Sequence, residues 1–170
     1  MNQHHAKTKK ILGIDPGTHL TGYGVILIDE KRQFSAIDYG CIRPPSSKPL
    51  TERYRIIFRA IETLLERYTP EAVAVETQYI HKNPQSGIKL GMARGVAVLA
   101  AALREIPVFE YAPSRAKRAV VGNGNASKAQ VQAMVQMLLS LPVLPQPEDA
   151  ADALALAICH GQAFTLGVQL

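Results

Sequence analysis

The chain has 170 residues, of which 47% are hydrophobic and 19% are charged. This composition excludes a disordered polypeptide and predicts one globular domain that buries about two thirds of its unfolded surface. Lysines and arginines number 19 against 14 acids. We therefore expect an anionic partner, although the charge alone does not identify it.

The amino-terminal segment and the cysteines indicate the compartment. Residues 1–10 are polar and lack the apolar core of a signal peptide, and the longest apolar run, 96–103, is too short to cross a bilayer. Cys41 and Cys159 are too far apart for a disulfide framework or a zinc site, so both are expected to be buried free thiols. We predict a cytoplasmic protein without membrane contact. Its predicted parts are a flexible arm at 1–10, one folded domain at 11–160 and a tail at 161–170.

The first predicted strand ends in a carboxylate. Residues 11–15 read Ile-Leu-Gly-Ile-Asp, which is typical of a strand buried on both faces, and a Pro-Gly turn follows. Asp15 is therefore either a turn cap or a functional acid. Residues 21–29 and 34–42 are predicted to be two further strands joined by a polar hairpin loop, so the sheet begins as an antiparallel meander.

Glycines follow this first strand. Gly17, Gly22 and Gly24 permit sharp turns and close backbone approach, which suit a tight hairpin or a phosphate-binding loop. We favour the hairpin, because glycine alone is weak evidence for phosphate.

Another predicted strand also ends in an acid. Apolar residues at helical spacing predict a helix from 50 to about 69, and the valine-rich run 71–76 that follows ends in Glu76. A strand, a crossover helix and a second strand favour parallel pairing. If the two strands are neighbours, Asp15 and Glu76 emerge at the same edge of the sheet, where their carboxylates are able to share a cation.

A glycine-striped helix is predicted next, from about 85 to 103. Gly87, Gly91 and Gly95 recur every four residues and leave one helix face bare. Internal packing and a subunit interface explain this stripe about equally well.

The last predicted helix carries two more acids. It follows a short strand at 106–110, helices at 112–121 and 127–139, and a proline-rich break at 141–147. Asp149 and Asp152 share a helix face with apolar residues further along, so both are expected to point at the body of the protein.

A basic span lies between the second and third acidic sites. Between Thr77 and Pro147 the acids are Glu105 and Glu110 alone. Carboxylates that hold hard cations, flanked by basic residues that hold phosphates, are what a metal-dependent enzyme acting on a polyanion requires. The candidate polyanion-binding residues in this span are Lys82, Lys89, Arg115, Lys117, Arg118 and Lys128.

Five segments in order resemble the RuvC-type Holliday junction resolvases, which are structure-selective endonucleases of the ribonuclease H-like superfamily. The segments are GIDPGTHLTGYGV, AVETQY, HKNPQSGIKLGMARGVA, PVFEYAPSRAKRAVVGNG and DAADALALA. The match runs from Ile11 to about His160, nearly the whole chain. The resemblance implies an α/β, ribonuclease H-like fold with a mixed five-stranded sheet flanked by helices, and it makes residues 11–160 the nuclease domain.

The resemblance also implies the site residues and the cofactor. Four acidic metal ligands map onto Asp15, Glu76, Asp149 and Asp152, which would hold two Mg²⁺ ions per active site, with Mn²⁺ able to substitute. Lys117 and Lys128 correspond to lysines near the scissile phosphate, and Tyr79 to an aromatic residue that stacks on bases. The other candidate DNA-binding residues are Arg115, Arg118, Lys82 and Lys89.

The implied reaction is paired, symmetric nicking of a four-way DNA junction in recombination and repair, giving 5′-phosphate and 3′-hydroxyl ends. A homodimer would present one site to each opposed strand. The resemblance places the dimer contact on the glycine-striped helix, which includes Met92 and Arg94. It also suggests the branch-migration proteins RuvA and RuvB as partners.

Three other functions fit parts of the sequence. An actin-like kinase or ATPase opens with a similar Gly-Ile-Asp-x-Gly turn but needs a second glycine-rich turn and about twice the length. A short ribonuclease H-like nuclease of the YqgF type would act on RNA. A non-enzymatic junction-binding module would use its acids only to support the fold, although four clustered acids without a cation repel one another.

Overall fold

The computed structural model describes residues 8–77 and 84–165. Strands and helices follow the predicted order along this part of the chain. The elements are β1 (Lys9–Asp15), β2 (Thr21–Ile28), β3 (Phe34–Ile42), α1 (Leu50–Tyr68), β4 (Ala72–Glu76), α2 (Pro84–Ala102), β5 (Val108–Tyr111), α3 (Pro113–Val121), α4 (Lys128–Leu138) and α5 (Glu148–Thr165).

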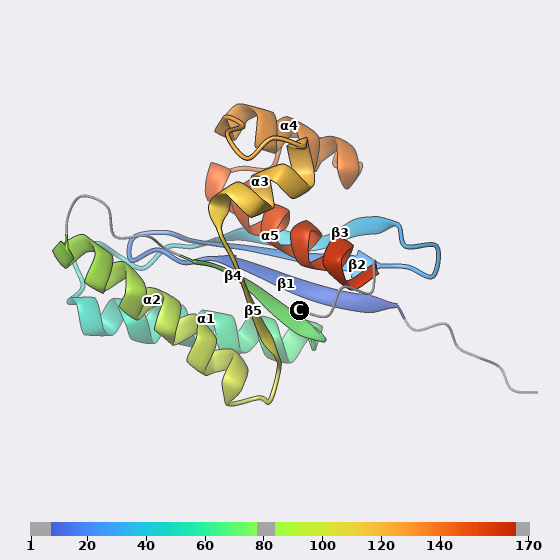
Figure 1. Ribbon diagram of the computed structural model, residues 1–170. Helices are drawn as coiled ribbons and strands as arrows, with labels where there is room; N and C mark the ends of the chain where they lie inside the picture. The colour runs from blue at the N-terminus through green and yellow to red at the C-terminus, as the bar shows by residue number, and fades with distance from the viewer. Residues whose placement is uncertain (1–7, 78–83, 166–170) are drawn as a thin grey trace, which may run out of the picture.

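The sheet has an antiparallel half and a parallel half. β1 pairs antiparallel with β2, and β2 pairs antiparallel with β3. On its other side β1 pairs parallel with β4, which pairs parallel with β5, so the strand order is β3-β2-β1-β4-β5. The predicted meander and parallel crossover are both confirmed. The carboxyl ends of β1 and β4 therefore lie at the same edge of the sheet, toward the left in Figure 1.

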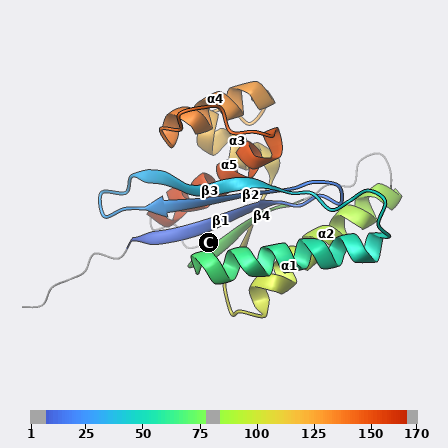
Figure 2. The same cartoon turned by 180° about the vertical axis from the view of Figure 1, so that it is seen from behind.

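Helices cover both faces of this sheet. α1 and α2 lie on one face, and α3, α4 and α5 lie on the other (Figures 1 and 2). The α1 face buries Leu12 and Ile14 of β1 against Ile57 and Ile61 of α1, all with no exposed surface. Each such aliphatic side chain contributes about 1.5–3 kcal/mol on burial, so the central strand is firmly fixed from this side.

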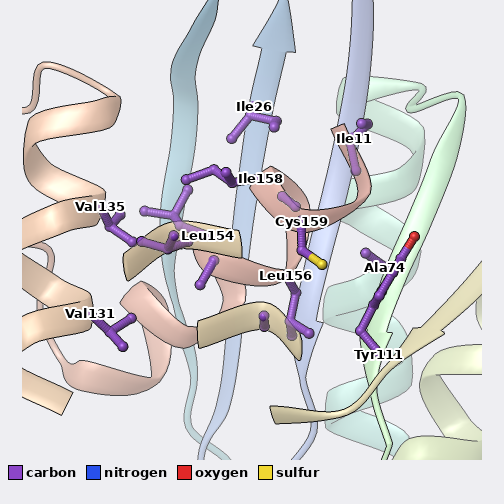
Figure 3. Packing of buried hydrophobic residues seen from close by; sticks show 14 of the residues in the cluster. Ile11, Ile26, Ala74, Tyr111, Val131, Val135, Leu154, Leu156, Ile158 and Cys159 are labelled. Atoms are coloured by element: carbon purple, nitrogen blue, oxygen red, sulfur yellow. The ribbon is translucent and has the colours of Figure 1, made fainter. Parts of the chain in front are cut away.

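The core on the other face is built around α5. Figure 3 shows Leu154 and Ile158 of α5 among Ile11 and Ile26 of the sheet and Val135 of α4. From Ala153 to Ile158 every residue of α5 is buried. A helix that is apolar all round is typical of a fully covered position, and α5 lies between the sheet and the α3–α4 pair (Figure 1).

Glycines in β1 and β2 allow α5 to lie unusually close to the sheet. A Cβ atom at Gly13 would be 1.9 Å from the carbonyl oxygen of Ala153, and one at Gly22 would be 2.1 Å from the carbonyl oxygen of Asp149. A Cβ at Gly24 would be 2.7 Å from the Leu154 side chain. The predicted hairpin role is therefore wrong for Gly22 and Gly24, which lie inside β2 and serve close helix approach instead.

Two predicted boundaries move outward. β1 begins at Lys9, so Lys9 and Lys10 of the predicted arm belong to the sheet. Their polar character hid this, because long charged side chains keep their stems along the protein while their ends remain in solvent. The Lys9 ammonium lies 3.6 Å from the centroid of the Phe164 ring. Likewise α5 continues to Thr165, beyond the predicted end of the domain at 160.

The two cysteines differ in burial. Cys159 is buried, as predicted, whereas Cys41 is only half-buried because β3 is an edge strand. Both are free thiols. Among residues 8–77 and 84–165 there is no helix whose length and apolar character would let it cross a membrane.

Candidate active site

Asp15 and Glu76 occupy equivalent positions at the ends of neighbouring parallel strands. Ile14 pairs with Val75, and the two acids come next along β1 and β4. Ile14 and Val75 pack on the α1 face. Because side chains alternate along a strand, Asp15 and Glu76 point to the face that α5 covers. The predicted meeting of these two acids at one sheet edge is confirmed.

The first turns of α5 bring Asp149 and Asp152 to the same edge. The glycines of β1 and β2 leave room for this end of the helix to lie against the strand that bears Asp15. A pocket of about 220 Å³ opens here, and its charged lining residues are Asp15, Glu76, Asp152, Lys117 and Lys128. Asp149 is not among the lining residues, but its charge acts on Asp15.

Burial and mutual repulsion perturb the acids in this pocket. Burial, followed by the charges of Glu76, Asp152 and Asp149, raises the pKa of Asp15 to about 8. Burial, followed by the charge of Asp152, raises the pKa of Glu76 to about 7. Burial also raises the pKa of Asp152. Closely spaced carboxyl groups of this kind retain protons that a bound cation displaces.

Lys128 balances part of this negative charge. Its Nζ lies 3.7 Å from Asp152 Oδ2 and 3.3 Å from Glu148 Oε2. Lys128 is the first residue of α4, where Ser127 and Gln130 form a reciprocal capping box that fixes the helix start. Glu148 is not among the residues predicted for the site, so its contact with Lys128 is a site feature that sequence reasoning missed.

Lys117 completes the basic side of the pocket. It lies on α3, and its positive charge lowers the pKa of Glu76, although burial outweighs that effect. The structure thus brings the two predicted phosphate-binding lysines to the acids. A pocket with carboxylates on one side and ammonium groups on the other suits a phosphate group held beside a cation.

The other predicted DNA-binding residues are not in this pocket. The Arg115 guanidinium lies over the Tyr111 ring, 4.9 Å from its centroid. Arg118 is exposed beside the loop that contains Gly124, and Lys89 is exposed on α2. Their role in DNA binding stays a prediction. Tyr79 and Lys82 fall outside the described residues.

The carboxylates of this pocket are ligands of the kind that hold a hard cation, but their side chains are not arranged around a common point. In the described part of the chain, no group of three or more His, Cys, Asp or Glu side chains is placed to hold a metal ion. Asp152 instead faces the Lys128 ammonium. Carboxylate oxygens are nevertheless the ligands that Mg²⁺ prefers, and burial and acidic neighbours, which raise the pKa values of Asp15 and Glu76, disfavour ionised carboxylates that a bound cation would stabilise.

Comparisons with known proteins agree with this arrangement. Residues 11–160 match the family model described as crossover junction endodeoxyribonuclease RuvC. The chain is 63% identical to the crossover junction endodeoxyribonuclease RuvC of Protochlamydia amoebophila (strain UWE25) over 152 residues, which cover 89% of this chain and 90% of that protein. It is 60% identical to the protein of that name from Chlamydia felis (strain Fe/C-56) over 155 residues, covering 90% and 92% of the two chains.

A solved structure extends the likeness to three dimensions. T. thermophilus RuvC in complex with a Holliday junction substrate superposes with a TM-score of 0.84 at 31% identity, covering 93% of this chain and 96% of that one. The sheet order and the acids at the ends of β1 and β4 thus define a ribonuclease H-like fold with a carboxylate site. Within that class, the chain belongs to the RuvC family of crossover junction endodeoxyribonucleases.

Proposed function

We propose that this protein is an endodeoxyribonuclease that resolves four-way DNA junctions by hydrolysing phosphodiester bonds. The observation that carries the proposal is the pocket in which carboxylates from β1, β4 and α5 face Lys117 and Lys128. Family membership supports the substrate, since the T. thermophilus relative is solved with a Holliday junction. A scissile phosphate in this pocket would lie between the acids and the lysines.

Asp15, Glu76, Asp149 and Asp152 are proposed to hold two Mg²⁺ ions. Once bound, such ions would supply a water nucleophile and would neutralise charge on the departing 3′ oxygen. Asp15, whose pKa is raised to about 8, would be one of the carboxylates that hold these ions. Lys128 gives up its contact with Asp152 and turns its ammonium toward the phosphate, while Lys117 stabilises charge that develops on the phosphoryl oxygens. The products carry 5′-phosphate and 3′-hydroxyl ends.

A homodimer is proposed to place one such site on each of two opposed strands. Ile88, Met92 and Leu99 recur along the outer face of α2, with exposed fractions of 60%, 51% and 53%. A Cβ atom at Gly91 or Gly95 would meet nothing within 4 Å. Internal packing therefore does not explain the glycine stripe at these two positions, and an exposed apolar face of this kind favours a protein interface.

Arg94 does not share this exposed position. It forms an ion pair with Glu110 of β5 in its own chain. We keep it as a residue at the border of the proposed dimer contact, whereas Met92 is central to it. The cellular role that we propose is recombination and DNA repair in the cytoplasm, together with the branch-migration proteins RuvA and RuvB.

Cleavage of an end-labelled synthetic four-way junction tests the proposal. The purified protein is incubated with and without Mg²⁺, beside linear duplex and RNA controls. Metal-dependent nicks at symmetric positions in the junction, lost in Asp15→Asn and retained in the surface variant Glu66→Gln, are expected. Cleavage of RNA in preference to the junction would instead favour a ribonuclease. Junction binding without cleavage under any divalent metal would contradict a nuclease function.

A further inference from the structure

A second hollow lies at the same edge of the sheet as the acid pocket. It is a groove of about 580 Å³ lined by His19, Leu20, Arg43, Pro44, Pro45 and Ser46. Thr21 and Ile42 form the last pair between β2 and β3. Leu20 and Arg43 come immediately outside this pair, so the groove is formed where the two strands separate.

The groove borders the acid site through the strand register. Asp15 pairs with Gly22 on β2, and Gly22 pairs with Cys41 on β3. Because neighbouring strands are about 4.8 Å apart, Cys41 lies about 10 Å from Asp15 along this line. Arg43 follows two residues later. The charges of Asp149, Asp15 and Arg43 all act on the Cys41 thiol, so this thiol is near both the acids and Arg43.

Both walls of the groove are held in place before any ligand binds. In the loop that leads to His19, the Thr21 hydroxyl accepts from the Gly17 N–H at 3.2 Å and donates to the Gly17 carbonyl at 2.8 Å. The buried Arg53 of α1 donates to the Thr18 carbonyl. In the opposite wall, the Lys48 N–H donates to the Pro45 carbonyl at 3.1 Å. A preformed groove avoids the entropy cost of ordering on binding.

The charge of the groove complements the lysines on the far side of the acids. Lys117 and Lys128 reach the pocket from α3 and α4, whereas Arg43 stands at the end of β3 on the other side. Arg43 and His19 are exposed, and Arg43 forms no ion pair within the described ranges. A nucleic-acid strand crossing the acids carries negative charge on both sides of the scissile bond, so Arg43 complements the lysines by offering a cation on the opposite side.

We propose that this groove is a subsite for the backbone of the cleaved DNA strand, a few nucleotides from the scissile phosphate. Arg43 receives one phosphate through its guanidinium, which is suited to paired contacts with phosphate oxygens. His19 and the Pro44-Pro45 wall border the adjoining sugar. The subsite rests on the proposed junction nuclease function and adds to it a residue that fixes where the strand enters the pocket.

Binding measurements test the subsite separately from catalysis. The affinity of the full chain for a fluorescent four-way junction is measured in EDTA at several salt concentrations. Arg43→Ala is expected to weaken binding about tenfold and to reduce the slope of log affinity against log salt by about one, because one phosphate contact is lost. The matched control is Arg59→Ala, which removes an exposed arginine of α1. It is expected to leave both values unchanged.

Neutral phosphates then locate the contact. Single methylphosphonates are placed at each of four positions on either side of the cleavage site. One position is expected to weaken binding of the wild type and to have no further effect on Arg43→Ala. Wild-type affinity and salt slope in Arg43→Ala, or equal sensitivity of both proteins at every position, would overturn the subsite. A wild type that binds but never cleaves would contradict the nuclease function and leave this binding test intact.

Discussion

Replacing Asp15 by Asn is predicted to stabilise the metal-free protein. Burial and the neighbouring acids raise the pKa of Asp15 from 3.8 to about 8. The folded protein therefore binds a proton at this carboxyl over a pH range in which the unfolded chain does not. Stability then falls as pH rises through that range. The amide of Asn is neutral at every pH and removes this unfavourable dependence.

The size of the effect follows from the pKa difference. Each unit of pKa shift corresponds to about 1.4 kcal/mol, so the cost at pH 7 is at most about 4 kcal/mol. Allowing for relaxation of the neighbouring acids, we expect Asp15→Asn to raise the free energy of unfolding in EDTA by about 2–4 kcal/mol. For a chain of this length the melting temperature would rise by roughly 5–15 °C.

Urea denaturation in EDTA measures the difference between pH 5 and pH 8.5. The increase in the free energy of unfolding caused by Asp15→Asn should grow with pH over this range. Adding Mg²⁺ should stabilise the wild type more than the variant, because the ion binds the folded carboxylates. Glu66→Gln, which removes an acid whose side chain is 76% exposed on α1, should change stability by less than about 0.5 kcal/mol. A metal-free Asp15→Asn less stable than wild type at pH 8 would refute the reasoning.

Three further predictions concern α5, His160 and α2. Gly13→Ala should lower the free energy of unfolding by about 3 kcal/mol, because the added Cβ would lie 1.9 Å from the Ala153 carbonyl oxygen. Urea denaturation measures this difference, and a variant as stable as the wild type would contradict the close packing of α5 on the sheet. Burial lowers the pKa of His160 to about 4. The unfolded chain therefore binds a proton first as pH falls below 6.5, and wild type should lose up to about 3 kcal/mol relative to His160→Gln between pH 7 and 4. Met92→Lys should convert the dimer to a monomer, which sedimentation at micromolar concentration would detect. A wild type that is already monomeric would contradict the proposed dimer interface.

The acids at the ends of β1 and β4 could be predicted because local signals were sufficient. Short apolar runs that end in Asp15 and Glu76, with a helix between them, specify parallel neighbours and one common edge. That inference needed no knowledge of distant contacts. Asp149 and Asp152 were also predicted to point at the body of the protein from their helix face, and Lys117 and Lys128 were assigned through the family resemblance rather than from spacing.

Features that depend on strand register were missed. Gly13 and Gly24 are cross-strand partners, and their shared role as a surface for α5 is visible only once β1 and β2 are aligned. The hydrogen bond of 2.7 Å between the Tyr111 hydroxyl and His160 Nδ1 joins residues 49 apart in sequence. The sequence around either residue gives no indication that the two are in contact. The groove beside Arg43 was missed for the same reason, since its walls come from two separate loops.

The most direct test of the central claim uses a supercoiled plasmid that extrudes a cruciform. If two symmetric active sites act in one bound dimer, the protein with Mg²⁺ should convert the plasmid directly to a linear product with ligatable ends. Asp15→Asn should bind the cruciform and leave the plasmid intact. Accumulation of nicked circles before any linear product would contradict paired cleavage by a dimer. Unchanged cutting by Asp15→Asn would contradict the assignment of the acid pocket as the active site.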